Sequence, residues 1–342
     1  MKPAKVSIVI PCRNEVHFIE TCLLAILGQE QSESLLEIIV ADGMSTDGTR
    51  RILEEFARKH PLVRLLDNPE RIVSTGLNRA IALARGDIVI RVDGHAEVAR
   101  DFIRSNLEVL DEHPEAWSVG GPIVHEARTR MGKAIALAMC HPLGVGNAKH
   151  RFPNYEGYAE GAAFPAIRKW VFQRIGTFDE TLVRNQDDEF NYRMRQAGGC
   201  IFVSPRIKYR YFVRESLSKV FRQYFQYAFW RVAVIRKHGQ ATALRQWVPS
   251  LFFGLCLAML CAGLMLRELV LAATLPFVYS IMLGLAGLCS ASRHGMGTAW
   301  RLPLAIATLH IAYAAGFLYG FWASIVKPDA WRRVDAMSEL SR

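Results

Sequence analysis

Residues 87–95 read D-I-V-I-R-V-D-G-H, an apolar strand pattern that ends in an acid, a glycine and a histidine. The apolar residues of Ile88–Val92 suit a buried strand. Asp93 and His95 are poor residues for a hydrophobic core, but both are common metal ligands. The stretch therefore predicts a strand that presents chemically active side chains at its carboxyl end.

The first hundred residues alternate strand and helix patterns. We expect strands at Val6–Ile10, Glu37–Asp42, Val63–Leu66 and Ile88–Val92, and helices at Val16–Leu27, Thr49–His60 and about Ser74–Ala84. Asp47 precedes the second helix and is better explained as its cap than as a ligand. Strands separated by helices of this length imply right-handed parallel crossovers and a doubly wound, mainly parallel sheet.

Ligands of a doubly wound sheet bind beside the carboxyl ends of its strands. Three of the expected strands end in polar residues, at Pro11–Glu15, Asp42–Gly48 and Asp93–His95. No G-x-G-x-x-G pattern follows the first strand, which favours a nucleotide held by side chains and a metal. Later segments are less regular: we expect a strand at Val119–Ile123, an apolar helix or lip at Met131–Val145 that could touch a membrane, and a loop-rich substrate wall at 151–164.

Apolar residues make up 51% of the chain and become dense after Trp247. Three runs there are uncharged or nearly so, and each is long enough to cross a hydrocarbon core as a helix: Val248–Leu266, Leu269–Ala291 and Leu302–Val326. The alternative is three very apolar core helices, but such runs are hard to place in a soluble protein. We therefore predict about three transmembrane helices.

The net charge of +10 is placed in a way that argues against a nucleic-acid partner. Residues 216–247 hold six basic residues, no acid and many aromatic residues, directly before the first apolar run. A solvated helix face is the alternative, but this composition favours a helix at the membrane interface, where basic residues attract anionic headgroups. The seven cysteines form no C-x-x-C pair and are expected to be reduced thiols.

Four motifs, in order, resemble those of a family 2 glycosyltransferase with the GT-A fold: V-S-I-V-I-P-C-R-N-E, I-I-V-A-D-G-M-S-T-D-G-T, D-I-V-I-R-V-D-G-H, and I-G-T-F-D-E followed by N-Q-D-D-E-F-N-Y-R-M-R-Q-A-G. In particular, the chain resembles membrane-attached bacterial enzymes of exopolysaccharide assembly, including succinoglycan-type glucosyltransferases. The likeness covers about Val6–Gly239. It implies a GT-A catalytic domain at 1–215, to which the composition adds a basic aromatic membrane-interface segment at 216–247 and a region of about three transmembrane helices with a short tail at 248–342.

The resemblance implies a metal-dependent, inverting transfer from a nucleotide sugar. Asp93 and His95 stand where the family usually has Asp-x-Asp, so both are predicted metal ligands, and Asp93 also faces the donor. The histidine is a departure. Because imidazole suits transition metals better than Mg²⁺, we expect Mg²⁺ or Mn²⁺, with Mn²⁺ tolerated.

The same resemblance places a UDP-sugar donor at the strand ends. Pro11, Arg13 and Glu15 are expected around the ribose and base, and Asp42 against the base. Arg13 or Arg71 could meet the diphosphate; Arg13 is equally explained as a solvated charge, and Arg71 is better explained as one.

Inversion requires one general base for the acceptor hydroxyl. Aligned with the family's E-D-x-D-L-x-x-R segment, Asp187 occupies the position of the base, with Gln186 in place of the usual Glu. Asp188 is an extra acid. Because Asp187, Asp188 and Glu189 are expected to raise one another's pKa values, the choice between Asp187 and Asp188 stays open.

Candidate acceptor residues come from two segments. Gln226 and Trp230 belong to a Q-Y-A-F-W stretch that is similar to the Q-x-x-R-W motif of processive synthases, but Phe229 replaces its arginine, which disfavours processive synthesis. Trp230 could stack on a sugar or anchor at the headgroup level. Tyr158 and Glu160 are expected to border the acceptor pocket.

These features lead to a hypothesis of an inverting transfer of a hexose from a UDP-sugar to a polyprenyl-diphosphate-linked saccharide, in exopolysaccharide or cell-surface glycan biosynthesis. The alternatives are a polyprenyl-phosphate sugar transferase and a non-catalytic membrane scaffold that binds nucleotide sugar. Other polysaccharide-assembly proteins are candidate partners.

Val6–Pro11 is too short for a signal-peptide core, so we expect a multi-pass protein of the bacterial inner membrane with a cytoplasmic catalytic domain. Three full spans would put Lys327, Arg332 and Arg333 outside, against the positive-inside rule. One run is therefore re-entrant, or the tail is too short to decide orientation.

Overall fold

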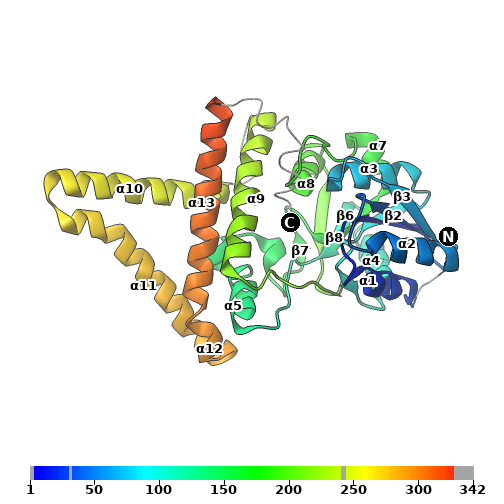
Figure 1. Cartoon of the computed structure of the whole chain (residues 1–342), viewed down its shortest axis with the longest axis horizontal. Coiled ribbons are helices and arrows are strands. Elements are labelled where there is room, and N and C mark those ends of the chain that lie inside the picture. Colours follow the sequence, from blue (N-terminus) through cyan, green and yellow to red (C-terminus); the bar gives the residue numbers. More distant parts are fainter. Residues whose placement is uncertain (1–3, 31–32, 240–243, 327–342) are drawn as a thin grey trace. The chain divides into compact units, whose positions relative to one another are not determined.

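A computed structural model describes residues 4–30, 33–239 and 244–326 (Figure 1). Within these residues the chain forms two compact units. The first unit comprises 4–30, 33–123 and 148–211, and the second comprises 124–147, 212–239 and 244–326. The change of unit at 211/212 lies close to the expected boundary at 215. However, residues 124–147 belong to the second unit, whereas the sequence interpretation assigned them to the catalytic domain.

The first unit is built on an eight-stranded sheet in the order β3-β2-β1-β4-β8-β6-β9-β7. The strands are β1 (Val6–Cys12), β2 (Leu35–Asp42), β3 (Val63–Asp67), β4 (Ile88–Arg91), β6 (Ala116–Gly121), β7 (Gly157–Tyr158), β8 (Ala163–Arg168) and β9 (Cys200–Val203). β3, β2, β1 and β4 are parallel neighbours, and β8 is antiparallel to β4 and β6. A short antiparallel pair, β5 (Glu97–Val98) and β10 (Tyr209–Arg210), lies outside this sheet. The predicted mainly parallel α/β architecture is confirmed.

Both faces of the sheet are buried, which explains why its strands read as continuous apolar runs. Alternate residues of β1 enter different cores: Ile8 and Ile10 pack on one face, and Val9 packs on the other. The helices and single-turn segment of this unit are α1 (Ile19–Leu27), α2 (Thr49–Lys59), α3 (Val73–Leu83), α4 (Phe102–Glu112), η1 (Lys149–Arg151), α7 (Lys169–Ile175) and α8 (Gln186–Gln196). The N-cap residue of α2 is Gly48, and the carboxylate of Asp47, one residue earlier, accepts hydrogen bonds from the Thr49 backbone N–H and hydroxyl.

The second unit is helical. Its elements are α5 (Arg130–Ala138), α6 (Pro142–Val145), α9 (Leu217–His238), η2 (Leu244–Gln246), α10 (Val248–Leu266), α11 (Leu269–His294), α12 (Met296–Ala299) and α13 (Leu302–Val326). The helix or lip expected at Met131–Val145 is two helices, because Pro142 lacks the N–H that would continue α5. Ala134, Ile135, Ala138 and Met139 share one hydrophobic cluster with residues of α9, α11 and α13. This cluster ties 124–147 to the second unit.

Three helices of the second unit are long and apolar enough to cross a membrane, by length and composition: Leu244–Leu266, Leu269–His294 and Met296–Val326. They differ in burial. Only 11% of the most apolar window is buried in each of the first two, compared with 44% in the third.

Candidate active site

The carboxyl ends of β1, β2 and β4 are neighbours in the sheet. Cys12 at the end of β1 pairs with Asp42 at the end of β2, and Val9 pairs with Arg91 at the end of β4. The three polar strand ends noted in the sequence therefore emerge at the same edge, as expected for a parallel sheet.

Arg91 links the two carboxylates on which the expected chemistry depends. Its guanidinium donates to Asp93 Oδ1, with Nε and Nη2 at 3.1 and 3.0 Å, and its Nη1 lies 3.9 Å from Asp187 Oδ2. Asp93 and Asp187 are 94 positions apart in the sequence but face one cation here. Sequence reasoning did not assign a role to Arg91. The available signal was its position, since it is the one charged residue in the apolar run I-V-I-R-V.

The surroundings of Asp93 favour its ionised form. Desolvation opposes ionisation, but the positive charges of Arg91 and His95 and the hydrogen bond from Arg91 outweigh it and lower the pKa of Asp93. A carboxylate at this position is therefore charged at neutral pH, as a ligand for a hard cation must be.

Asp187 and Asp188 lie in the first turn of α8, which begins at Gln186 after Asn185, a residue with a left-handed φ of 60°. The Asp188 backbone N–H donates to Asp187 Oδ1 at 2.9 Å. Although 55% of the Asp187 side chain is exposed, desolvation by surrounding protein atoms, followed by the negative charge of Asp188, raises the pKa of Asp187. A base with a raised pKa holds a transferred proton more strongly.

Glu189 does not join this pair of acids, contrary to the expectation of three mutually repelling carboxylates. It is fully buried, and its two oxygens accept hydrogen bonds from Arg193 Nε at 2.9 and 3.0 Å. Arg193 also donates to the backbone carbonyls of Ile175 and Thr177. Glu189 therefore helps to fix α8 against the segment that precedes it, which positions Asp187.

Both ring nitrogens of His95 have partners in the protein. Nδ1 lies 3.0 Å from Glu15 Oε1, and Nε2 lies 2.8 Å from Tyr211 Oη. To bind a metal, His95 would have to release one of these partners. The role of His95 as a metal ligand stays a prediction. In the structure, His95 connects Glu15, which follows β1, with Tyr211, which follows β10.

Within the described residues no three His, Cys, Asp or Glu side chains are grouped so that they could hold a metal ion. This arrangement still fits Mg²⁺ or Mn²⁺ used with a diphosphate, because such ions are often held by one or two carboxylates plus substrate phosphates and water. Asp93, ionised and at the end of β4, is the residue best suited to supply that carboxylate.

The expected nucleoside residues lie at the ends of β1 and β2. Pro11 is a residue of β1, and the Arg13 side chain passes Gly43 so closely that a Cβ there would lie 3.1 Å from its carbons. Asp42 is only 1% exposed, and its carboxylate accepts hydrogen bonds from the Ser45 hydroxyl at 2.5 Å and from Arg50 at 3.4 Å. A contact between Asp42 and a base would therefore require these partners to move.

The predicted acceptor residues come from both units: Tyr158 and Glu160 belong to the first, and Gln226 and Trp230 belong to the second. Tyr158 lies on the edge strand β7, where its hydroxyl donates to Glu115 and its ring packs against Phe202. This is four strands from β4 in the sheet order, so the structure does not bring Tyr158 beside Asp93. By contrast, a Cβ on Gly161, next to Glu160, would lie 2.9 Å from Asn191 of α8, one turn after Asp187. Gln226 and Trp230 are buried residues of α9 in the second unit.

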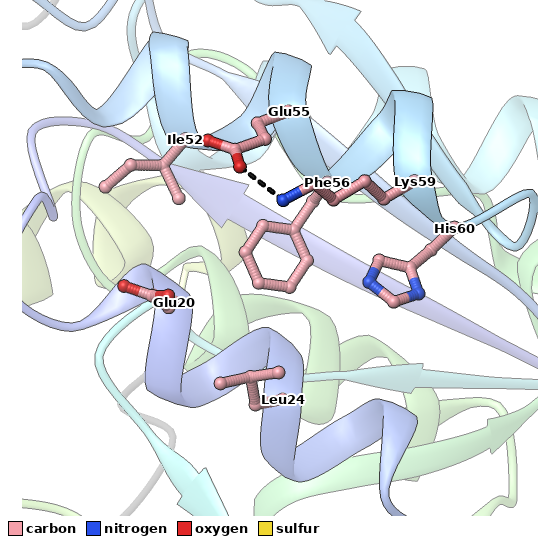
Figure 2. Close-up of a pocket in the computed structure, with 7 residues that line it drawn as sticks. All are labelled: Glu20, Leu24, Ile52, Glu55, Phe56, Lys59 and His60. Carbon is pink, nitrogen blue, oxygen red and sulfur yellow. Dashed lines mark hydrogen bonds and ion pairs between the residues drawn. The ribbon is translucent and has the colours of Figure 1, made fainter.

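A pocket elsewhere in the first unit contains none of the predicted residues. It lies between α1 and α2 and is lined by Glu20, Leu24, Ile52, Glu55, Phe56, Lys59 and His60 (Figure 2). An ion pair of 2.5 Å between Lys59 and Glu55 stands at its rim (Figure 2).

The sequence profile described as glycosyl transferase family 2 matches residues 7–155. The succinoglycan biosynthesis protein ExoA of Rhizobium meliloti (strain 1021) is 33% identical over 344 residues, with 96% of each chain covered. This chain belongs to glycosyltransferase family 2.

Other relatives of this family 2 glycosyltransferase agree with that assignment. A dolichyl N-acetyl-alpha-D-glucosaminyl phosphate 3-beta-D-2,3-diacetamido-2,3-dideoxy-beta-D-glucuronosyltransferase of Methanococcus voltae is 26% identical over 95% of this chain and 98% of its own. The mannosyltransferase PcManGT from Pyrobaculum calidifontis, solved with GDP-Man and Mn²⁺, superposes with a TM-score of 0.53 at 20% identity, covering 100% of this chain and 86% of its own. Residues 1–349 of S. aureus TarS give 0.50 at 15% identity, with 90% of each chain covered. These two structures support the GT-A fold of the family 2 glycosyltransferase.

Proposed function

We propose that this glycosyltransferase moves a hexose, with inversion, from a UDP-sugar to a polyprenyl-diphosphate-linked saccharide at the cytoplasmic face of the bacterial inner membrane. The product would serve exopolysaccharide or cell-surface glycan synthesis. One observation carries the proposal: Arg91 contacts both Asp93 and Asp187, so a carboxylate suited to a metal and a carboxylate suited to a base face the same place.

The charged residues at this site would have different roles in the transfer. Asp187 would accept the proton of the attacking hydroxyl, since its raised pKa makes it a stronger base than an ordinary aspartate. Asp93 would hold a divalent ion, with His95 as a second ligand if it releases Glu15 or Tyr211. Such an ion offsets the negative charge that develops on a diphosphate leaving group. Arg91 keeps the two carboxylates from repelling each other.

The names of the relatives support the substrate classes. The Rhizobium meliloti relative acts in succinoglycan biosynthesis, and the name of the Methanococcus voltae relative describes transfer to a sugar carried on a lipid phosphate. A structural neighbour was solved with a nucleotide sugar and Mn²⁺. A lipid-linked acceptor also fits a second unit with three helices apolar enough to enter a bilayer.

The test is transfer from radiolabelled UDP-hexoses in membranes that contain the full chain, supplied either with polyprenyl-diphosphate-linked saccharides or with undecaprenyl phosphate. We expect label in the saccharide, dependent on Mg²⁺ or Mn²⁺. Label on undecaprenyl phosphate alone would reject the proposed acceptor in favour of a polyprenyl-phosphate sugar transferase. Nucleotide-sugar binding without transfer from any donor would favour a non-catalytic scaffold.

The same assay identifies the base. We expect Asp187→Asn to lower kcat by about 10²- to 10⁴-fold, the usual contribution of a positioned base, with little change in the KM for the donor. Asp188→Asn is the matched control, because it also removes one negative charge from the first turn of α8. If Asp187→Asn leaves turnover unchanged and Asp188→Asn lowers it strongly, the general base is Asp188 and not Asp187.

A further inference from the structure

Helix α13 has two different faces. Its exposed large apolar residues include Leu304, Ile311, Leu318 and Ile325, each 45–67% exposed. A spacing of seven residues is close to two helical turns, so these side chains form one stripe along the whole helix. We call this the α13 stripe. The opposite face is buried and rich in small residues.

Helix α9 covers the buried face. A Cβ on Gly316 would collide with the carbonyl oxygen of Phe225, and one on Gly320 would lie 3.1 Å from the carbonyl oxygen of Phe229. Further along, Arg236 Nη1 donates to the backbone carbonyl of Ser324 at 2.9 Å. Later residues of α9 therefore contact later residues of α13, which means that the two helices run side by side in the same direction (Figure 1).

The charge of α9 decides where this pair of helices can lie. Lys219, Arg222, Arg236 and Lys237 are exposed, and they occur at both ends of α9. In a crossing helix, basic residues at both ends would reach both interfaces. Half of them would then lie on the outer side, against the positive-inside rule, whereas each gains about 1 kcal/mol beside an anionic cytoplasmic surface. If α13 crossed the bilayer, α9 would have to enter it alongside. The charges of α9 favour the membrane surface instead.

The hairpin of α10 and α11 has the opposite character. Among its residues only a few small or weakly polar side chains and Leu283 are buried, and exposed leucines, such as Leu251, Leu257 and Leu264 of α10, occur along its length. The turn carries two charged residues, Arg267 and Glu268. With 19 residues, α10 is about 28 Å long, close to the thickness of a hydrocarbon core. In Figure 1, α10 runs across the direction of α9 and α13.

We propose that only α10 and α11 cross the bilayer, and that α13 lies with α9 along its cytoplasmic surface. The α13 stripe then faces the boundary between headgroups and acyl chains, and the basic residues of α9 meet anionic lipids. Lys327, Arg332 and Arg333 lie outside the described residues. With two crossings, the chain that follows α13 is expected on the cytoplasmic side, in agreement with the positive-inside rule. The inference concerns the second unit only, and its test does not use sugar transfer.

Depth measurement separates the two arrangements. A ketone-bearing amino acid, which takes a nitroxide without involving the seven native cysteines, would replace Leu304, Ile311, Leu318 or Ile325 singly. The full chain would be reconstituted in vesicles of phosphatidylethanolamine and anionic phosphatidylglycerol. Relative accessibility of the nitroxide to oxygen and to a water-soluble nickel complex then reports its depth. All four positions are exposed, so the label should not disturb packing.

We expect the same shallow depth at the four positions. A crossing helix would instead spread them over about 31 Å, at 1.5 Å per residue, and would overturn the proposal. Four fully aqueous positions would overturn it as well. Leu251, Leu257 and Leu264 of α10 are the matched controls and should differ in depth by about 20 Å from first to last. Equal depths in α10 would reject its crossing.

A second measurement counts crossings without substituting any residue. Protease-sensitive tags at the N-terminus and at the C-terminus should be cleaved from the same side of sealed, oriented vesicles, because two crossings return the chain to its starting side. Cleavage of the two tags from opposite sides would show an odd number of crossings and reject the inference.

Discussion

Arg91 is the residue that joins the two halves of the proposed chemistry. Its guanidinium is held by Asp93 and lies near Asp187, and in turn it lowers the pKa of Asp93 and opposes the rise in the pKa of Asp187. One cation at the end of β4 therefore influences both the carboxylate proposed to bind a metal and the carboxylate proposed as the base. A substitution there should change proton transfer as well as donor binding.

The charges around Asp187 predict two pH shifts of opposite sign. A general base works only when ionised, so the rate rises with pH through its pKa. Asp188→Asn removes a charge that raises the pKa of Asp187, so the acidic limb of kcat should move to lower pH. Arg91→Met removes a charge that lowers this pKa, so the limb should move to higher pH, with a fall in kcat of about 10- to 100-fold from loss of positioning. Profiles of kcat against pH for the three proteins check both signs, and shifts in the same direction would contradict this account.

At this scale the sequence indicated candidate residues for the proposed chemistry but not the contacts that they make. Asp93 and Asp187 could be predicted, because polar residues at strand ends and the family motifs mark them. The sequence could not predict that the Asp42 carboxylate accepts hydrogen bonds from Ser45 and Arg50, because these contacts depend on how the turn after β2 folds. The hydrogen bond between His95 and Tyr211 likewise connects residues that are 116 positions apart in the sequence, and no local sequence pattern indicates it.

At the scale of the elements, the buried acid Glu37 of β2 forms hydrogen bonds that connect the sheet to Arg85, in the segment after α3. Glu37 is 1% exposed and accepts hydrogen bonds from the Ser7 hydroxyl at 2.8 Å, from the Arg85 backbone N–H at 2.7 Å and from Arg64 at 2.9 Å. Desolvation opposes ionisation, but these bonds and the charge of Arg85 outweigh it and lower the pKa of Glu37.

We expect Glu37→Ala to destabilise the protein by about 1–3 kcal/mol at pH 7, because the Ser7 hydroxyl and the Arg85 backbone N–H lose their acceptor. The folded-state pKa lies below the unfolded value, so this stabilisation is complete above the unfolded pKa and is lost as the pH falls through the folded one. The difference in melting temperature between wild type and variant should therefore shrink in acid. A constant difference down to the most acidic pH would refute the ionic part of this explanation.

The packing of α9 on α13 predicts opposite outcomes for two glycines in apolar helices. Gly316→Ala places a methyl group against the backbone of Phe225 and should cost about 1–3 kcal/mol, as overpacked sites do. Gly254→Ala in α10 has nothing within 4 Å of the added Cβ, so stability should be unchanged or slightly raised. Thermal unfolding of both variants in the same detergent is the measurement. Equal losses would show that α9 and α13 do not approach this closely.

Elements with local signals were predicted well, and those set by distant pairing were not. β1 to β4 and the three helices between them match the expected ranges within a few residues, because periodicity and capping mark them. β8 was missed: Ala163–Arg168 inserts antiparallel between β4 and β6, a position determined by sheet pairing. The break between α5 and α6 was also missed, although Pro142 was its visible signal.

For the molecule as a whole, neither unit is a continuous stretch of chain. Residues 124–147 leave the first unit, join the cluster formed with α9, α11 and α13, and return. The points of exit and return are close together, because the Ile123 N–H donates to the His150 carbonyl at 2.5 Å. A cut at the boundary expected from the sequence would therefore separate α5 from the helices that bury it.

We expect a chain truncated after Tyr211 to aggregate, because Ala134, Ile135, Ala138 and Met139 lose the apolar partners that bury them. A second version, in which a short Gly-Ser linker also replaces 124–147, should remain soluble and monomeric. Soluble yield and size-exclusion chromatography compare the two. Equal solubility of both would mean that α5 does not depend on the second unit for burial.

The excursion of 124–147 also sets an order of events on the ribosome. Leu302, a partner of the α5 segment, is synthesised 164 residues after Ala138, which takes about 8–33 s at ordinary elongation rates. During that interval α5 lacks the partner that α13 provides, while α10 and α11, the two helices proposed to cross the bilayer, are being synthesised. The protein is thus expected to need a chaperone or a nearby lipid surface early in its biogenesis, well before its last helix leaves the exit tunnel.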